Sequence, residues 1–360
     1  MQLQSVIMSR YLRKNIAGIA GYIPGEQPQD SGFIKLNTNE NPYPPSPRVL
    51  SALRKAAAHS LRLYPEPLSD SLRSLAAARY GLRSENVIAG NGSDELLSIL
   101  VRCFVGRGER VVYPVPTYTL YDTLISIQEA EKVGVDYPPD FSLPGALFSQ
   151  KAALTLLCNP NSPSGTLVSV REIEGLARSV SGVLVVDEAY IDFAEGEGAS
   201  SLPLVKNFPN LVVLHSFSKS FSLAGMRIGL GFANEEIIAD MMKVKDSYNV
   251  NRLSLVAGMA ALQDLPWMMR NVSRIQRSRG KLTRGLKKIG FQVYRSHANF
   301  VMARKEGQNL RGLYQELKRR KILVRYFDLP GLRDSLRISV GTPQEIAALL
   351  RELESIQTVL

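Results

Sequence analysis

The sequence predicts an α/β protein in which a large domain with a mostly parallel sheet is joined to a smaller α+β domain. The chain has 360 residues, which is more than a single hydrophobic core of ordinary size contains. Strand-like segments, several of them continuous apolar runs, alternate with helical patterns up to residue 250. After that point a long helical pattern is followed by short strands. We therefore expect a large domain at 45–250 and a small domain formed by residues 1–44 and 251–360.

The individual elements follow from local patterns. A proline-rich loop at 39–47 predicts extended chain before a helix, and Asp94 and Glu95 suit the start of another helix. The large domain is expected to contain helices at 48–59 and 95–105, and strands at 110–113, 132–135, 153–158, 182–186, 211–214 and 226–232. The small domain is expected to contain helices at 266–289, 308–320 and 342–356, and strands at 291–294, 298–303, 322–325 and 336–340. Polar residues that follow strands of an open α/β sheet are candidates for a ligand site.

The composition argues against several classes of protein. Hydrophobic residues make up 45% and charged residues 21%, which is typical of a packed protein rather than a disordered one. Cys103 and Cys158 cannot form a disulfide framework, and with three His they cannot form a zinc cluster, so we expect a cytoplasmic protein without a metal. The chain shows neither the apolar core of a signal peptide nor a run of the roughly 20 apolar residues of a membrane helix, so we expect no membrane partner.

The net charge of +11 invites a nucleic-acid partner. The densest basic runs, at 318–321 and between residues 270 and 288, both have helical apolar spacing. This spacing favours solvated helix faces, so we expect no nucleic-acid partner. A third interpretation is that a few arginines bind small anions.

The most informative segment is HSFSKSFSLAGMRIG at 215–229. It places Lys219 in a turn of small, hydroxyl-bearing residues after an apolar strand, with Arg227 eight positions later. Hydroxyls and an arginine suit a phosphate, and a lysine among small residues can lose its water shell and act as an amine nucleophile. The alternative is a serine-rich loop with a solvated lysine.

Three further segments favour the site over the loop. DEAY at 187–190 and NPNSPSG at 159–165 each lie at the end of a predicted strand. GNGSD at 90–94 is a glycine-rich turn entering a helix, whose N–H groups can hold a phosphate. Each pattern is common alone, but their order and spacing together are specific.

With these segments the sequence resembles the fold-type-I pyridoxal-phosphate aminotransferases, and within them the histidinol-phosphate aminotransferase family. The resemblance extends from KLNTNENP at 35–42, through RLYPE at 62–66, to LRISVGT at 336–342. It implies a transaminase that uses pyridoxal 5'-phosphate and exchanges an amino group between L-histidinol phosphate and 2-oxoglutarate. The products would be imidazole-acetol phosphate and L-glutamate, in L-histidine biosynthesis.

The resemblance also implies roles for individual residues at the cofactor. Lys219 matches the lysine that binds the cofactor aldehyde and then moves a proton as base and acid. Asp187 matches the carboxylate that faces the pyridine nitrogen, and Tyr190 matches a hydrogen-bond donor to the phenolic oxygen. Tyr118 matches the aromatic residue that stacks on the ring. The residues expected around the cofactor phosphate are Gly92, Ser93, Asp94, Ser216, Ser218 and Arg227.

Other matches concern the partner subunit and the substrate. Tyr64 matches a tyrosine that reaches the phosphate from the neighbouring subunit, which implies a homodimer; the alternative is a packed surface aromatic. Arg337 matches the arginine that binds the carboxylate of the amino donor. Arg325 matches a second cation for the phosphate end of the substrate, or is an ordinary charge at a strand edge. Tyr22 and Asn39 match N-terminal positions that fold over the pocket.

The chain departs from the family pattern at two places. Ser162 stands where asparagine usually bonds the phenolic oxygen of the cofactor, and Ser164 replaces the usual threonine. Either the Ser162 hydroxyl or the side chain of Asn161 could make this contact, or Tyr190 could carry it alone. Ser216 also replaces a threonine but keeps the hydroxyl.

Other functions share parts of this pattern. An aromatic amino acid aminotransferase acting on phenylalanine or tyrosine would use the same cofactor residues, and a phosphothreonine decarboxylase would bind a similar phosphate. Arg325 favours a phosphorylated substrate over an aromatic one. A binding protein that keeps the fold without the chemistry would be expected to lack Lys219 or Asp187, and the chain has both.

Overall fold

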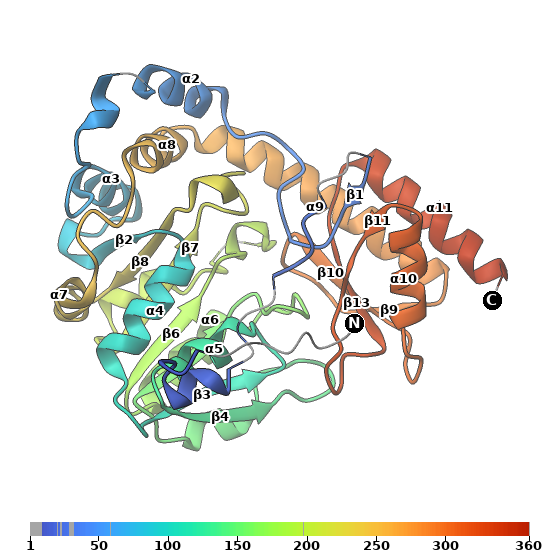
Figure 1. Ribbon diagram of the computed structural model, residues 1–360, viewed down its shortest axis with the longest axis horizontal. Coiled ribbons are helices and arrows are strands. Elements are labelled where there is room, and N and C mark those ends of the chain that lie inside the picture. Colours follow the sequence, from blue (N-terminus) through green and yellow to red (C-terminus); the bar gives the residue numbers. More distant parts are fainter. Residues whose placement is uncertain are drawn as a thin grey trace.

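The computed structural model describes residues 9–19, 21, 24–28, 32–57, 59–196 and 198–359. Its larger unit is built on a seven-stranded sheet with the order β2-β8-β7-β6-β5-β3-β4. The strands are β2 (Val87–Gly90), β3 (Arg110–Val115), β4 (Glu131–Asp136), β5 (Leu154–Cys158), β6 (Val183–Asp187), β7 (Leu211–Ser216) and β8 (Gly229–Ala233). In this sheet β8 pairs antiparallel with β2 and β7, and the pairs from β7 to β4 are all parallel, so the predicted α/β class with a mostly parallel sheet is confirmed (Figure 1).

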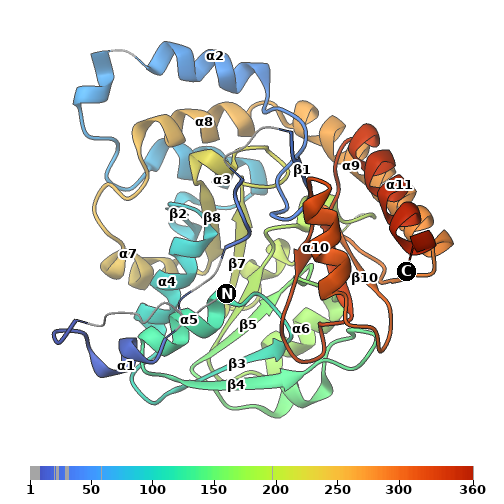
Figure 2. The same cartoon turned by 45° about the vertical axis from the view of Figure 1, so that its right-hand side comes forward.

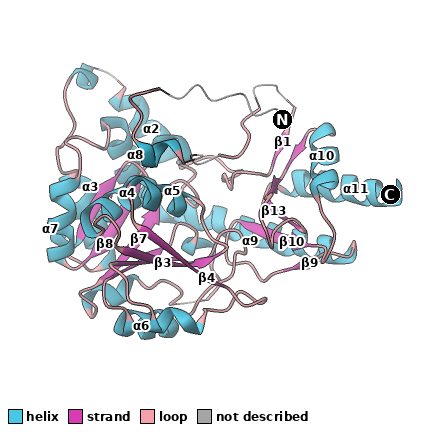
Figure 3. Ribbon diagram, turned by 60° about the horizontal axis from the view of Figure 1, so that its bottom comes forward, coloured by secondary structure: helices cyan, strands magenta, loops and turns pink. Residues whose placement is uncertain are grey.

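Helices cover both faces of this sheet, which explains why its strands are apolar runs rather than alternating patterns. Val185 and Val212 pack in one core with α4 (Ser93–Phe104), α5 (Leu120–Ile127) and α7 (Glu235–Val244). Their neighbours Val186 and Val213 pack in a second core with α3 (Asp70–Tyr80), α6 (Val170–Ser179) and α8 (Arg252–Leu262). Figure 3 shows α4 and α6 on opposite sides of the sheet. Strand β2 and the helices α3, α5, α6, α7 and α8 are not among the predicted elements.

The smaller unit contains a four-stranded antiparallel sheet with the order β12-β13-β10-β9. Its strands are β9 (Gln292–Val293), β10 (Phe300–Arg304), β12 (Arg325–Tyr326) and β13 (Ser335–Ser339), and its helices are α9 (Leu265–Lys288), α10 (Arg311–Arg319) and α11 (Pro343–Val359). A separate parallel pair joins β1 (Ile34–Lys35) to β11 (Ile322–Leu323). Strand β1 thus joins the smaller unit, while α9 extends from the side of α8 into it (Figure 1).

Two strand predictions need correction. The strand expected at 322–325 is two strands, because β11 pairs with β1 while β12 pairs with β13. The strand expected at 226–232 begins only at Gly229, because Arg227 adopts the left-handed conformation, with φ of 52°, and interrupts the extended chain. In both cases the apolar run continues through a point at which the strand itself is interrupted.

Packing suggests a different division of the chain from the expected one. Helix α8 lies beside α2 (Pro47–Ala56) in Figure 2, and Leu255, Ala257 and Ala261 lie in the core of the larger unit. The short helix α1 (Lys14–Ala17) also lies against the larger unit, where Arg13 pairs with Glu129. We propose that the larger unit extends through α8 and that only the part of the N-terminal segment around β1 belongs to the smaller unit.

The remaining helical turns are short 3-10 helices at His59–Arg62, Ser84–Asn86, Gly145–Ser149, Ile191–Phe193, Leu202–Lys206 and Ala224–Met226. Among the described residues, no helix combines the length and the apolar character needed to cross a membrane.

Candidate active site

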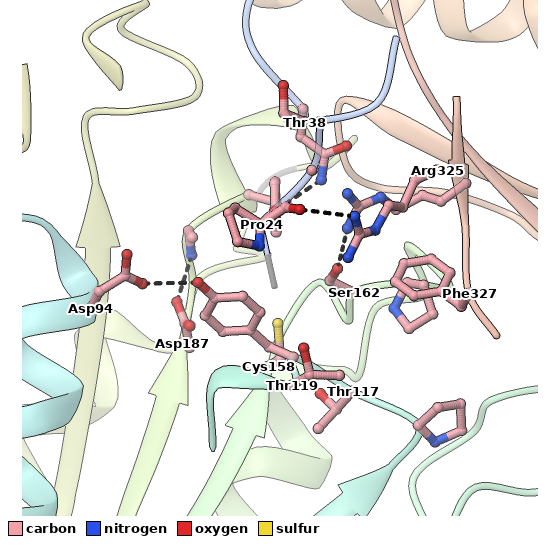
Figure 4. Close-up of a pocket in the computed structure, with 18 of the residues that line it drawn as sticks. Pro24, Thr38, Asp94, Thr117, Thr119, Cys158, Ser162, Asp187, Arg325 and Phe327 are labelled. Carbon is pink, nitrogen blue, oxygen red and sulfur yellow. Dashed lines mark hydrogen bonds between the residues drawn. The ribbon is translucent and has the colours of Figure 1, made fainter. Parts of the chain in front are cut away.

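A cavity of about 600 Å³ opens where the two units meet. Its floor is formed at the carboxyl ends of parallel strands, by Cys158, Asp187 and Ser216, the last residues of β5, β6 and β7. Its wall includes Arg325 and Arg337 of the smaller unit. In Figure 4, Asp94 and Asp187 lie on one side of the cavity and Arg325 and Phe327 on the other. This is the position at which open α/β sheets bind ligands.

Lys219 lines the floor of this cavity in the turn that follows β7. The side chain of Asn41 donates to the backbone oxygens of Lys219 (3.0 Å) and Ser220 (3.2 Å) and so holds this turn. The Lys219 Nζ lies 5.5 Å from the centroid of the Tyr190 ring. Loss of hydration, together with the positive charge of Arg337, lowers the pKa of Lys219 to about 8. A lysine of this pKa exists partly as the neutral amine near neutral pH, as a nucleophile or base requires.

Asp187 is the last residue of β6 and is only 3% exposed. Its carboxylate accepts hydrogen bonds from the Ala189 N–H (3.2 Å) and from the Tyr121 hydroxyl (3.3 Å). Burial and the nearby charge of Asp94 raise the pKa of Asp187 to about 6. A buried carboxylate that lines a cavity is suited to a ligand that brings a positive charge or an N–H donor to it.

A second part of the site has the composition of a phosphate-binding pocket. Arg227 bonds Asp94 (3.1 Å) and the Ser218 hydroxyl (3.2 Å), and Ser93 begins helix α4, a helix of 12 residues. The Arg227 guanidinium lies close against the Gly92 backbone: a Cβ on Gly92 would lie 2.6 Å from it, and Gly92 has φ of +86°. Ser216, Ser218, Asp94 and Arg227 all line the cavity. Hydroxyls, an arginine and a helix N-terminus match the donors that a phosphate requires.

Tyr118 and Tyr190 add two aromatic rings to the cavity. The Tyr118 hydroxyl donates to Asp94 (3.1 Å), and its ring packs edge-on against Tyr121. The Tyr190 hydroxyl accepts a hydrogen bond from the Asn39 side chain (3.1 Å). Burial raises the pKa of the Tyr190 hydroxyl, which therefore keeps its proton at neutral pH.

The wall contributed by the smaller unit carries two arginines. The Arg337 guanidinium donates to the Ser162 hydroxyl (3.0 Å) and to the Asn37 backbone oxygen (3.0 Å). It also lies 5.3 Å and 5.5 Å from the centroids of Phe300 and Phe327. Arg325 donates to the backbone oxygen of Pro24 (3.2 Å). Two guanidinium groups in one cavity wall give it the charge that an anionic substrate needs.

Ser162 and Asn161, in the loop after β5, were both candidates for the contact that an asparagine makes in the family. Their side chains have different environments in the structure. Asn161 is buried, where it accepts from the Thr117 hydroxyl (2.8 Å) and donates to Ser164 (2.9 Å). Ser162 lines the cavity and accepts from Arg337. The structure therefore uses Asn161 to hold the loop and leaves Ser162 facing the site.

The structure does not bring Tyr64 to this cavity. Tyr64 is 78% exposed and stacks on Tyr248 with 4.6 Å between ring centroids, away from the residues that line the cavity of this chain. Tyr22 lies outside the described residues. Conversely, the contacts of Asn41 and Tyr121 were not predicted. Asn41 could have been found from its place in the NENP segment. No feature of the sequence distinguishes the buried Tyr121 from an ordinary core residue.

No group of three or more His, Cys, Asp or Glu side chains in the described part of the chain could hold a metal ion. The cavity fits an organic phosphate cofactor instead. The lysine, the buried carboxylate and the phosphate-binding pocket together define the site of a pyridoxal-phosphate-dependent aminotransferase of fold type I.

Comparison with known proteins agrees with this class. A sequence model of the aminotransferase class I and II family matches residues 31–353. Histidinol-phosphate aminotransferase 1 of Trichormus variabilis is 44% identical over 97% of this chain and 99% of its own length. Histidinol-phosphate aminotransferase of Citrifermentans bemidjiense is 46% identical over 96% of this chain and 98% of its own length. The chain belongs to the aminotransferase class I and II family, and within it to the histidinol-phosphate aminotransferases.

A solved structure extends the comparison to the fold and the cofactor. Histidinol-phosphate aminotransferase from Sinorhizobium meliloti, crystallised in complex with pyridoxal-5'-phosphate, superposes with a TM-score of 0.88 at 25% identity. The match covers 98% of this chain and all of the other. This likeness confirms the predicted fold-type-I architecture.

Proposed function

We propose that the protein transfers an amino group reversibly between L-histidinol phosphate and 2-oxoglutarate, giving imidazole-acetol phosphate and L-glutamate in L-histidine biosynthesis. The observation that carries this proposal is the pair Arg325 and Arg337 in the cavity wall that also holds Phe327. A phosphate with two negative charges suits both guanidinium groups of this pair, whereas the α-carboxylate of glutamate needs only Arg337. An aromatic amino acid likewise offers only its α-carboxylate, so Arg325 would have no anion to bind while such a substrate occupies the site.

Pyridoxal 5'-phosphate, when bound, supplies an electron-withdrawing ring that accepts an amino group and stabilises negative charge on the substrate carbon. Asp187, Tyr190 and Tyr118 would hold its ring, and Ser93, Ser216, Ser218 and Arg227 would hold its phosphate. The Asp187 carboxylate would keep the ring nitrogen protonated. The Lys219 Nζ would bind the cofactor covalently at rest and, as the neutral amine, would take the proton from the substrate Cα and return it.

The substrates would be oriented by the wall. Arg337 is fixed from two sides, by Ser162 and by the Asn37 backbone, so its guanidinium has little freedom left to lose when a carboxylate or phosphate binds. Arg325 adds a second positive charge at the same wall. Glutamate and histidinol phosphate would use the site in turn, in a ping-pong cycle.

We further propose that the protein works as a homodimer in which Tyr64 contacts the cofactor phosphate of the partner subunit. The proposal is supported by the exposure of Tyr64, Leu61 and Leu63, which lie close together in sequence and are all at least half exposed. A mixture of Tyr64→Ala and Lys219→Ala proteins tests it, because a hybrid dimer contains one site with both Tyr64 and Lys219 intact. Activity above that of either variant is expected, and activity no higher than theirs would contradict the shared site.

A cytoplasmic location is proposed on separate grounds, since both cysteines are free.

The substrate assignment is tested by kcat/KM for L-histidinol phosphate and for L-phenylalanine, each with 2-oxoglutarate as acceptor. We expect a clear preference for histidinol phosphate. A preference for phenylalanine would overturn the assignment and leave the cofactor site untouched.

A further inference from the structure

Asn39 lies between the two units and is bonded to both. It is 1% exposed and lies in the chain that leads from β1 to the larger unit. Its backbone N–H donates to the Ser339 hydroxyl (2.8 Å), and its backbone oxygen accepts from the Asn299 side chain (2.9 Å). Both partners belong to the smaller unit. Its side-chain nitrogen instead donates to the hydroxyl of Tyr190, which follows β6 in the larger unit (3.1 Å).

The orientation of the Asn39 amide follows from the Ser339 hydroxyl. That hydroxyl accepts from the Asn39 backbone N–H, and its own hydrogen is donated to the Asn39 Oδ1 (2.9 Å). Turning the amide around would place its NH₂ against Ser339 and remove the acceptor of the serine hydrogen. The NH₂ group therefore faces Tyr190, which must act as the acceptor.

This arrangement decides what the Tyr190 proton can do. A phenol that accepts from Asn39 keeps its own O–H to donate in another direction, and Tyr190 lines the cavity. We propose that Asn39 is a positioning residue for Tyr190. Its amide directs the Tyr190 hydroxyl proton into the cavity, toward the phenolic oxygen of the cofactor. The bond between the Asn39 amide and Ser339 makes this orientation depend on the placement of the smaller unit.

Asn39 was expected to contact the substrate. In this proposal its amide instead forms its hydrogen bonds with Tyr190 and Ser339. The proposal rests on the proposed cofactor site but not on the proposed substrate. The backbone of Asn39 has φ of 56°, a conformation that asparagine, aspartate and glycine tolerate. Asn39→Gly therefore removes the amide with little strain, and Asn39→Asp keeps the shape while replacing the donor by an acceptor.

The test is the pH at which the absorbance of the bound cofactor changes, measured without substrate in Asn39→Gly, Tyr190→Phe and the double variant. A hydrogen bond donated to the phenolic oxygen stabilises its anionic form, so losing that bond raises the midpoint. We expect a rise of about one pH unit in Asn39→Gly, a similar or larger rise in Tyr190→Phe, and no additional rise in the double variant. Asn39→Asp should raise the midpoint at least as much as Asn39→Gly, because the carboxylate would take the Tyr190 proton.

Asn299→Ala is the matched control, since it loosens the same segment but leaves the Asn39 amide and its Ser339 contact in place. It should lower the melting temperature and leave the midpoint unchanged. An unchanged midpoint in Asn39→Gly, or shifts that add in the double variant, would overturn the inference. Should Asn39→Gly fail to fold, Asn39→Asp alone decides, because a midpoint equal to that of the wild type excludes the role. A wild-type protein without any cofactor absorbance would instead refute the proposed function.

Discussion

The floor and the wall of the cavity are built in different ways. Lys219 and Asp187 form the floor at the ends of adjacent strands of one sheet, where burial moves the pKa of the lysine down to about 8 and that of the carboxyl up to about 6. Arg325 and Arg337 form the wall, where contacts join distant chain segments, such as Arg337 and Asn37, which are 300 positions apart. Burial at the floor sets the proton affinities of the groups that would transfer protons. The arginines of the wall supply the positive charge that would select an anionic substrate.

The largest effect is expected from the floor. Lys219→Ala removes both the covalent attachment of the cofactor and the base, and we expect a loss of at least about ten-thousand-fold in kcat. Melting temperature and circular dichroism should show that the variant still folds. A variant that keeps substantial transaminase activity would show that another group moves the proton.

Asp187→Asn should follow with a loss of about a thousand-fold in kcat, because a neutral amide cannot hold the ring nitrogen in its protonated form. The carboxyl has its pKa raised to about 6, so the cofactor affinity of the wild type should fall as the pH drops below 6. The asparagine variant should lack this acid limb. A retained limb in the variant would assign it to another group.

At the wall, the effect should be smaller and selective. Arg325→Gln removes one charged partner of the substrate phosphate, and we expect kcat/KM for histidinol phosphate to fall by about 10- to 100-fold while the value for glutamate changes little. Arg319→Gln on the exposed face of α10 is the matched control, because Arg319 pairs only with Glu316 of its own helix among the contacts found in the described chain. Equal losses for both substrates would assign Arg325 to the glutamate carboxylate or to the fold.

The last prediction concerns the stability of the cofactor-free protein rather than its activity, and it again applies to the floor alone. The pKa of Lys219 is lowered from the ordinary 10.5 to about 8, so its burial destabilises the cofactor-free protein wherever the unfolded chain would be charged. Lys219→Met should therefore increase the free energy of unfolding by up to about 3 kcal/mol at pH 7. The gain should be complete below pH 8 and vanish as the pH rises to 10.5. Urea unfolding of both proteins at several pH values measures it, and a gain independent of pH would point to packing instead.

The sequence predicted the parts of this molecule that depend on local pattern. The buried strands are apolar runs, and Asp187 ends one of them. The segments that hold Lys219 and Ser93 combine glycine, serine and charge in ways that point to phosphate and amine chemistry. The fold class and the family follow from them and were confirmed. Helix α8 was not predicted, because it is apolar on nearly all sides and therefore shows no amphipathic period.

What could not be predicted are the contacts between distant segments. Nothing in the sequence near Ser162 indicates that its hydroxyl accepts a hydrogen bond from Arg337. Nor does it indicate that the Asn161 side chain is bonded to Thr117 and Ser164. The Asn39 bond to Tyr190 spans 151 positions and exists only once the two units are in place. Such contacts are set by tertiary packing rather than by local propensity, and they determine which way the polar side chains at the site point.

The most direct test of the central claim is to find the residue that carries the cofactor. The purified protein with bound pyridoxal 5'-phosphate is reduced with borohydride and digested, and the modified peptide is identified by mass spectrometry. We expect a single labelled lysine, Lys219, on the floor of the cavity, and no label in Lys219→Ala. A label on any other lysine, or the same label in the Lys219→Ala protein, would contradict it.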